Sequence, residues 1–255
     1  MRALLVLAIT VVVAAQASAH VAPSVDENNR YLKLTPLGDR VRLAYTVFFG
    51  EVPGAQLRPS IDADHDGLIS ESEAQTFGTK LAAEVAAALD VSVDAGKHDI
   101  VWAEVSVGMG SPTVRGGSFS IDLITYLCLP AARGRHAVVM RDRFQLPRPG
   151  ETEVLVEDSP GVAVDHARIG PIEDPGHDYR FVGAGGPLAD AGLDLVFTAS
   201  DRAPLGDASC NTSGPQAQRG VPTSLVVGAA AVLGFVLAAI VAFVRRGRDR
   251  RPARR

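Results

Sequence analysis

The chain has 255 residues, 47% of them hydrophobic and only 5% aromatic, with a formal net charge of −4. Without Arg2 and residues 245–255, the remainder carries 17 basic and 28 acidic side chains, a net charge of −11. Acidity of this order argues against a nucleic-acid partner and fits the binding of metal ions. The length is ample for one hydrophobic core or for two small ones.

The N-terminus, residues 1–19, is predicted to be a secretory signal peptide. Arg2 supplies its positive region, residues 4–15 form a short apolar run, and Ala17-Ser18-Ala19 is a small-x-small cleavage site. An uncleaved membrane anchor is the alternative, but the apolar run is short for a membrane span. Cleavage after Ala19 makes His20 the first residue of the mature chain and places the following residues outside the cytoplasm.

Residues 29–49 are predicted to form a β-hairpin. A turn sequence, Pro36-Leu37-Gly38-Asp39, separates two stretches in which apolar and polar residues alternate. A period of two places the apolar set on one face of the hairpin, which we expect to be buried. That set consists of Leu32, Leu34, Val41, Leu43, Tyr45, Val47 and Phe49.

Residues 62–73 match the calcium loop of an EF-hand, D-x-[DN]-x-[DN]-G-x5-E, at every defined position. Calcium takes six to eight oxygen ligands, so acidic side chains at alternate positions can converge on one ion, and Gly67 permits the sharp turn between them. An acidic surface loop that fits the pattern by chance is the alternative. The predicted Ca2+ ligands are Asp62, Asp64, Asp66, the Leu68 carbonyl, Ser70 through a water molecule, and both oxygens of Glu73.

The segments around this loop resemble half of an EF-hand pair. Ser70 and Glu73 have the spacing of a capping box, and an amphipathic helix is predicted from there to about Leu89. Residues 51–61 contain two prolines and a glycine, so a full incoming helix is not expected. No second loop is found, because residues 90–101 have their glycine one place late and a valine at the closing position. An unpaired loop outside the cell predicts a Kd on the order of 10⁻⁴–10⁻³ M.

The rest of the exported region is predicted to be rich in β-strands. Apolar residues alternate over residues 101–107, with Val101, Ala103, Val105 and Val107 facing inward, and residues 119–129 are apolar on both faces, which is typical of a central strand. Further strands are expected near residues 136–144, 152–157, 162–169, 178–183 and 193–199.

About nine short strands and one helix predict a mainly β fold. The predicted domain is a β-sandwich over residues 20–199, with the EF-hand-like loop and helix inserted at about 55–89. A split into two smaller β-domains near residue 111 stays open, and the strand order is not predicted.

The C-terminal part predicts one membrane crossing. Residues 200–223 are polar and are predicted to be a flexible tether. Residues 224–244 carry no charge and, as a helix, would span about 31 Å, the thickness of a bilayer core. Seven arginines in residues 245–255 form a basic tail that favours the cytoplasmic side. The expected location is therefore the bacterial cell membrane, crossed once, with the N-terminal domain outside.

Two cysteines are present, Cys128 in the predicted central strand and Cys210 in the predicted tether. The exported location permits a disulfide, whereas a mobile tether disfavours one, so both a disulfide and a free buried Cys128 thiol stay open.

A second metal site and an enzymatic function are the competing hypotheses. A mature N-terminal His20 offers its amine and imidazole together, which suits copper or nickel, so copper or nickel binding is the alternative function. The sequence lacks Gly-x-Ser-x-Gly, His-Glu-x-x-His and a Cys/His nucleophile pair. No catalytic residue is therefore expected.

Several short motifs in residues 20–96 carry a family resemblance. They are Ala19-His20, Asp39-Arg40-Val41-Arg42-Leu43-Ala44-Tyr45, Glu51-Val52-Pro53, Ile61-Asp62-Ala63-Asp64-His65-Asp66-Gly67 and Val91-Ser92-Val93-Asp94. This part resembles the extracytoplasmic EF-hand domain that precedes bacterial nickel/cobalt-type transporters. The resemblance implies an accessory or sensing role in metal uptake, with a membrane metal transporter as partner. A multi-helix permease follows in that family and a single predicted span follows here, so transport by this chain alone is not expected.

Overall fold

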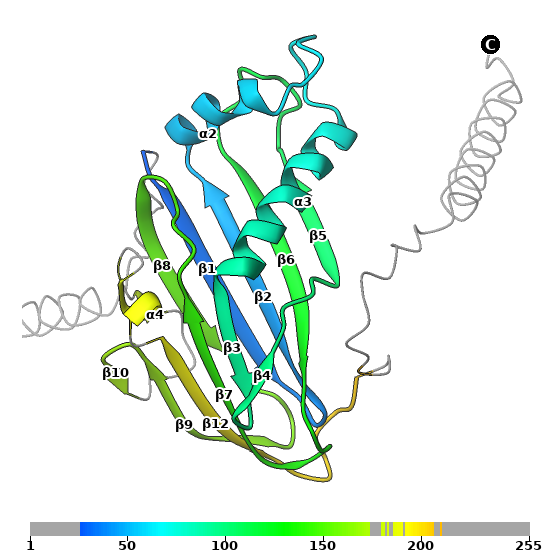
Figure 1. The fold of residues 1–255 in the computed structure, drawn as a ribbon, viewed down its shortest axis with the longest axis vertical. Helices are drawn as coiled ribbons and strands as arrows, with labels where there is room; N and C mark the ends of the chain where they lie inside the picture. Colours follow the sequence, from blue (N-terminus) through cyan, green and yellow to red (C-terminus); the bar gives the residue numbers. More distant parts are fainter. Residues whose placement is uncertain are drawn as a thin grey trace, which may run out of the picture. The chain divides into compact units, whose positions relative to one another are not determined.

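A computed structural model describes residues 26–173, 180–181, 183, 186–190, 192–206 and 210 (Figure 1). These residues form two six-stranded sheets, so the mainly β fold class is confirmed. In spatial order, the first sheet contains β11 (Arg180–Phe181), β8 (Pro149–Val156), β1 (Asn28–Pro36), β2 (Arg40–Phe49), β6 (Phe119–Cys128) and β5 (Glu104–Gly108). The second contains β10 (Ile172–Glu173), β9 (Val162–Ile169), β12 (Leu193–Ala199), β7 (Gly134–Asp142), β3 (Leu89–Val93) and β4 (Gly96–His98).

Helical segments lie in two of the connections between strands, β2 to β3 and β11 to β12. The helices are α2 (Glu51–Leu57), the following 3-10 turn η1 (Arg58–Ser60), α3 (Glu71–Ala88) and α4 (Gly186–Asp190). Figure 1 shows α2 and the start of α3 at one end of the first sheet, opposite the turn between β1 and β2. The described chain holds twelve strands where about nine were expected. β4 and β10 were not predicted, because strands of two or three residues are too short to show a period of two, whereas β11 lies within the strand predicted near residues 178–183.

The predicted hairpin is present as β1 and β2, which pair antiparallel with Leu34 opposite Leu43. Its alternating apolar residues are buried, as the period of two requires. The strand predicted over residues 119–129 is present as β6 (Phe119–Cys128), which lies between β2 and β5 inside the first sheet, so its predicted position away from the sheet edge is confirmed. In the first sheet, β2 precedes residue 111 in the sequence and its neighbour β6 follows it. In the second sheet, the same holds for the neighbours β3 and β7. A domain boundary near residue 111 would cut both sheets.

A buried polar cluster joins the two sheets through Asp142 of β7. Its carboxylate accepts a hydrogen bond from the Tyr45 hydroxyl on β2 at 2.8 Å and forms an ion pair with Arg30 on β1. The second guanidinium nitrogen of Arg30 donates to the Phe144 carbonyl at 2.8 Å. Because Asp142 is almost fully buried, these donors replace the water that its charge would otherwise lose.

The prediction of a strand over residues 101–107 is wrong for the first half of that range. Only Glu104–Gly108 is a strand, and Val101 is exposed while Trp102 is buried. The indole N–H of Trp102 donates to the Ala82 carbonyl of α3 at 2.7 Å. The large apolar indole is thus buried under the helix, and its one polar atom has a hydrogen-bond partner. Burial of this ring stabilises the fold more than burial of the small apolar residues on either side would.

The predicted tether begins later than residue 200, because residues 200–206 pack on the domain. Ala203 is buried, the Pro204 carbonyl accepts a bond from the Gly38 N–H at 2.8 Å, and Asp39 accepts one from the Gly206 N–H at 3.1 Å. A disulfide joins Cys128 to Cys210, with 5.7 Å between their Cα atoms. The predicted signal peptide, His20, the membrane span 224–244 and the basic tail lie outside the described residues. Within the described part of the chain, no helix has the length and apolarity to span a membrane.

Helix α3 packs on β5 through Gly78, a poor helix former. A Cβ atom at this position would lie 2.5 Å from Cγ2 of Val107, closer than real contacts allow. The glycine therefore sets the distance between the helix and the sheet.

Replacing Gly78 by alanine is expected to lower the free energy of unfolding. The gain in helix propensity of about 1 kcal/mol is outweighed by overpacking, which costs about 1–3 kcal/mol. Urea denaturation of Gly78→Ala measures the change, and the double variant Gly78→Ala/Val107→Ala should recover part of the loss. A more stable Gly78→Ala variant would contradict this packing.

Removing the disulfide in Cys128→Ser/Cys210→Ser is also expected to destabilise the domain. The bond closes a loop across a sequence separation of 82. On the chain-entropy model a loop of that length corresponds to about 4.5 kcal/mol. Urea denaturation with and without a reductant checks this, since the reductant should lower the stability of the wild type and leave the double variant unchanged.

Candidate metal centre

The acidic loop of residues 62–73 is held at both ends by the core. It follows η1, whose first residue, Arg58, accepts backbone bonds from Ile61 at 3.0 Å and Asp62 at 3.3 Å. Ile61 and Ile69, at either end of the turn, are 4% and 5% exposed. The loop therefore leaves the core and returns to it over a few residues, which limits the space its acidic side chains can sample.

The predicted capping box is present at the start of helix α3. The Ser70 hydroxyl accepts a bond from the Glu73 N–H at 3.3 Å, and the Glu73 carboxylate accepts one from the Ser70 N–H at 2.8 Å. Two N–H groups at the helix start, which have no partner in the helix itself, are satisfied in this way.

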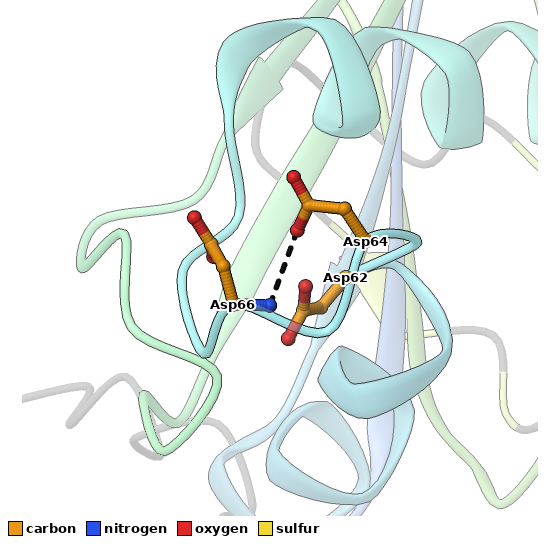
Figure 2. Close-up of side chains that lie close together, drawn as sticks. All are labelled: Asp62, Asp64 and Asp66. Carbon is orange, nitrogen blue, oxygen red and sulfur yellow. Dashed lines mark hydrogen bonds between the residues drawn. The ribbon is translucent and has the colours of Figure 1, made fainter.

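Three predicted ligands converge in the loop. Asp62, Asp64 and Asp66 each offer a carboxylate oxygen within 4.8 Å of the others (Figure 2). The backbone is shaped by the same side chains, because Asp64 accepts from the Asp66 N–H at 3.2 Å and Asp62 from the Gly67 N–H at 3.1 Å. Gly67 has a φ of +86°, the left-handed conformation that glycine adopts without strain.

Asp62 differs from its two neighbours in burial. Asp64 and Asp66 are exposed, whereas Asp62 is 5% exposed. Its second oxygen, Oδ1, is buried and has no hydrogen-bond partner among the described residues. A buried carboxylate oxygen without a donor has lost its hydration and gained no hydrogen bond in return, which is unfavourable. The charges of the two neighbouring carboxylates also repel it. A bound cation would relieve both costs.

Glu73 ties the end of the loop to its beginning. One carboxylate oxygen accepts bonds from the N–H groups of Ala63 at 2.6 Å and Asp64 at 3.4 Å, and the other from the Ser70 backbone and hydroxyl. These bonds, the Ser70 backbone bond foremost, lower the pKa of Glu73 to about 2. Glu73 thus lies beside the three aspartates without joining their cluster.

The other two predicted ligands lie close by in different roles. The Ser70 hydroxyl is engaged in the cap, and the Leu68 N–H donates to Asp66 at 2.7 Å. Leu68, half-exposed, also forms an isolated β-bridge with Thr113. This neighbour, a loop at residues 109–118, was not predicted to contact the acidic loop, and neither was the Arg58 side chain that holds it. The only sequence signal was the turn-rich composition of that loop, which gave no hint of its partner.

Comparisons of the chain with protein-family models, with curated proteins and with solved structures found no match. The geometry of the loop is therefore the structural basis for a functional proposal.

The Ser70→Ala variant is expected to raise the pKa of Glu73 part of the way from about 2 toward its ordinary value of 4.5, because it removes the hydroxyl bond and keeps the Ser70 backbone bond. Because the folded pKa is depressed, the bonds of Glu73 stabilise the wild type above pH 4.5, and this stability is lost as the pH falls toward 2. Carboxyl NMR titration of the metal-free protein measures the pKa. Thr76→Ala, on the next turn of the helix, is the control, and a Glu73 pKa that stays the same in Ser70→Ala would contradict the capping geometry.

Proposed function

We propose that this protein is a membrane-anchored, extracytoplasmic calcium-binding protein with one EF-hand-type loop set in a β-sandwich. The observation that carries the proposal is Asp62, a buried carboxylate that has an oxygen with no donor and points into a cluster with Asp64 and Asp66. The membrane anchor and the exported location rest on the sequence patterns of residues 1–19 and 224–255.

The donor set favours calcium among the common metal ions. The available ligands are all oxygens, which suit calcium and magnesium and disfavour copper or zinc. Magnesium requires a near-ideal octahedron, whereas calcium accepts six to eight ligands in irregular arrangements. The aspartate cluster brings three such ligands together, and the other predicted ligands, the Leu68 carbonyl, Ser70 and Glu73, lie in the same short loop.

Calcium would neutralise the repulsion of three carboxylates and satisfy Asp62. We expect the binding to be weak, with a Kd on the order of 10⁻⁴–10⁻³ M, because no second EF-hand lies beside the loop in the described part of the chain. A Kd in this range is close to the calcium concentration outside cells, which favours a structural ion over a regulatory switch. An accessory role beside a membrane metal transporter rests on the resemblance of residues 20–96 alone, and copper or nickel at His20 stays a prediction outside the described residues.

The test is titration calorimetry and thermal melting of the purified full chain with calcium. At about 10 mM calcium the expected stabilisation is about 1.4–2.7 kcal/mol, which follows from the expected Kd by mass action. Asp62→Asn should abolish the binding heat and, because it removes a buried charge, should leave the metal-free protein as stable or more stable.

Asp99→Asn is the matched control, since Asp99 is an exposed aspartate outside the loop. It should bind calcium as the wild type does. Equal melting of the wild type with and without calcium, and no binding heat, would overturn the proposal.

A further inference from the structure

We infer that Arg58 is a positioning residue for the calcium loop, and that residues 109–118, here called the support loop, take the place of a second EF-hand beside it. Calcium binding and the order of the support loop are then coupled. This inference rests on the proposed calcium function and adds to it a regulated segment outside the motif.

The Arg58 guanidinium holds the support loop through backbone carbonyls. The side chain is fully buried, and the Arg58 guanidinium lies 5.6 Å from the centre of the Phe119 ring. Its nitrogens donate to the carbonyls of Ser111 at 2.8 Å, Thr113 at 2.9 Å, Gly117 at 2.9 Å and Ser118 at 3.3 Å, and to that of Met109. The planar fork of an arginine can reach several acceptors at once, and a lysine has no equivalent geometry.

The backbone of Arg58 holds the first calcium ligand. Its carbonyl accepts the bond from the Asp62 N–H at 3.3 Å. The buried aspartate and the support loop are therefore fixed by two parts of one residue, four positions before Asp62 in the sequence.

The support loop in turn holds the far side of the calcium loop. The Val114 N–H donates to the Gly67 carbonyl at 3.1 Å, and the Ile69 N–H donates to the Pro112 carbonyl at 2.6 Å. These bonds flank Leu68, whose carbonyl is a predicted ligand, and directly follow Asp66. Both sides of the carboxylate cluster are thus connected to Arg58, one directly and one through the support loop.

Reciprocity follows from this connection. Pro112 and Thr113, at the tip of the support loop, are exposed, so the tip is held mainly by Arg58 and the calcium loop, whereas the end of the loop is also bonded to α2, where Glu51 accepts from the Ser118 N–H at 3.4 Å. An ion that fixes residues 66–69 therefore also stabilises the support loop, and loosening the support loop weakens binding by the same free energy. The effector is calcium, and the responding element is a loop at the edge of the first sheet, beside β5.

Two variants and one exchange measurement test the coupling on the full chain. Arg58→Lys and Val114→Pro, which removes the N–H that bonds to Gly67, are each expected to raise the calcium Kd about 10-fold or more, as removal of groups that orient metal ligands does. Hydrogen exchange of residues 109–118 in the wild type should slow when calcium is added, and should not change in Asp62→Asn.

Arg40→Lys is the matched control. Arg40 is a buried arginine that is paired with Asp39 at the opposite end of β2. This variant should lower the melting temperature and leave the calcium Kd unchanged.

The outcomes separate the two proposals. Absence of calcium binding in the wild type overturns the calcium function and this inference with it. If the wild type binds calcium and hydrogen exchange in residues 109–118 does not change, the inference alone is overturned. The same holds if a folded Arg58→Lys or Val114→Pro variant binds calcium with an unchanged Kd. The exchange measurement needs no variant, so it decides the matter even where a substitution prevents folding.

Discussion

The buried guanidinium of Arg58 imposes the constraint from which the calcium-loop end of the molecule is built. A cation without water must find an acceptor for each of its donors, or the protein bears the full cost of its desolvation. Here the acceptors are backbone carbonyls of residues 109–118, which must curl around the side chain to present them. Once curled, that segment lies where its own N–H and carbonyl groups can pair with residues 67–69. The acidic loop is therefore supported by a neighbour that shares none of its sequence pattern.

A buried charge also lies between the sheets at Asp142, where the protein itself supplies the donors that the charge requires. There both oxygens of the buried carboxylate have donors, because Oδ2 meets Arg30 and the Tyr45 hydroxyl and Oδ1 accepts from the Phe144 N–H. At Asp62 the match is incomplete, since only one of its oxygens accepts a bond and the neighbouring side chains are carboxylates. The carboxylate of one buried aspartate is thus satisfied by the fold, and the other keeps an oxygen without a donor, which is the basis of the proposed cation site. This contrast, more than the count of acidic residues, distinguishes the loop from a solvated acidic surface.

Features whose signal is local in the sequence could be predicted from it, and features set by tertiary contacts could not. The hairpin, β6 and the Ser70 cap follow from a period of two and from a three-residue spacing, both of which act over a few neighbours. The three converging aspartates follow from alternate positions in one turn. By contrast, Trp102 is inward because a carbonyl of α3 lies within reach, and residues 200–206 dock because the β1–β2 turn offers backbone partners. Neither partner is visible from the segment itself.

The contacts around the loop limit what an ion could change in the fold. The capping box is made by Ser70 and Glu73, α3 packs through Leu81 and Val85, and both flanking isoleucines are buried, so the aspartate cluster itself forms none of these contacts. The proposed ion would act first on the three carboxylates and then, through the loop backbone, on the bonds that Gly67 and Ile69 make with the support loop. The support loop is exposed at Pro112 and Thr113, whereas the flanking isoleucines lie in the core. A site placed in this way would stabilise one end of the β-domain, and its effect outside the motif would extend through residues 109–118.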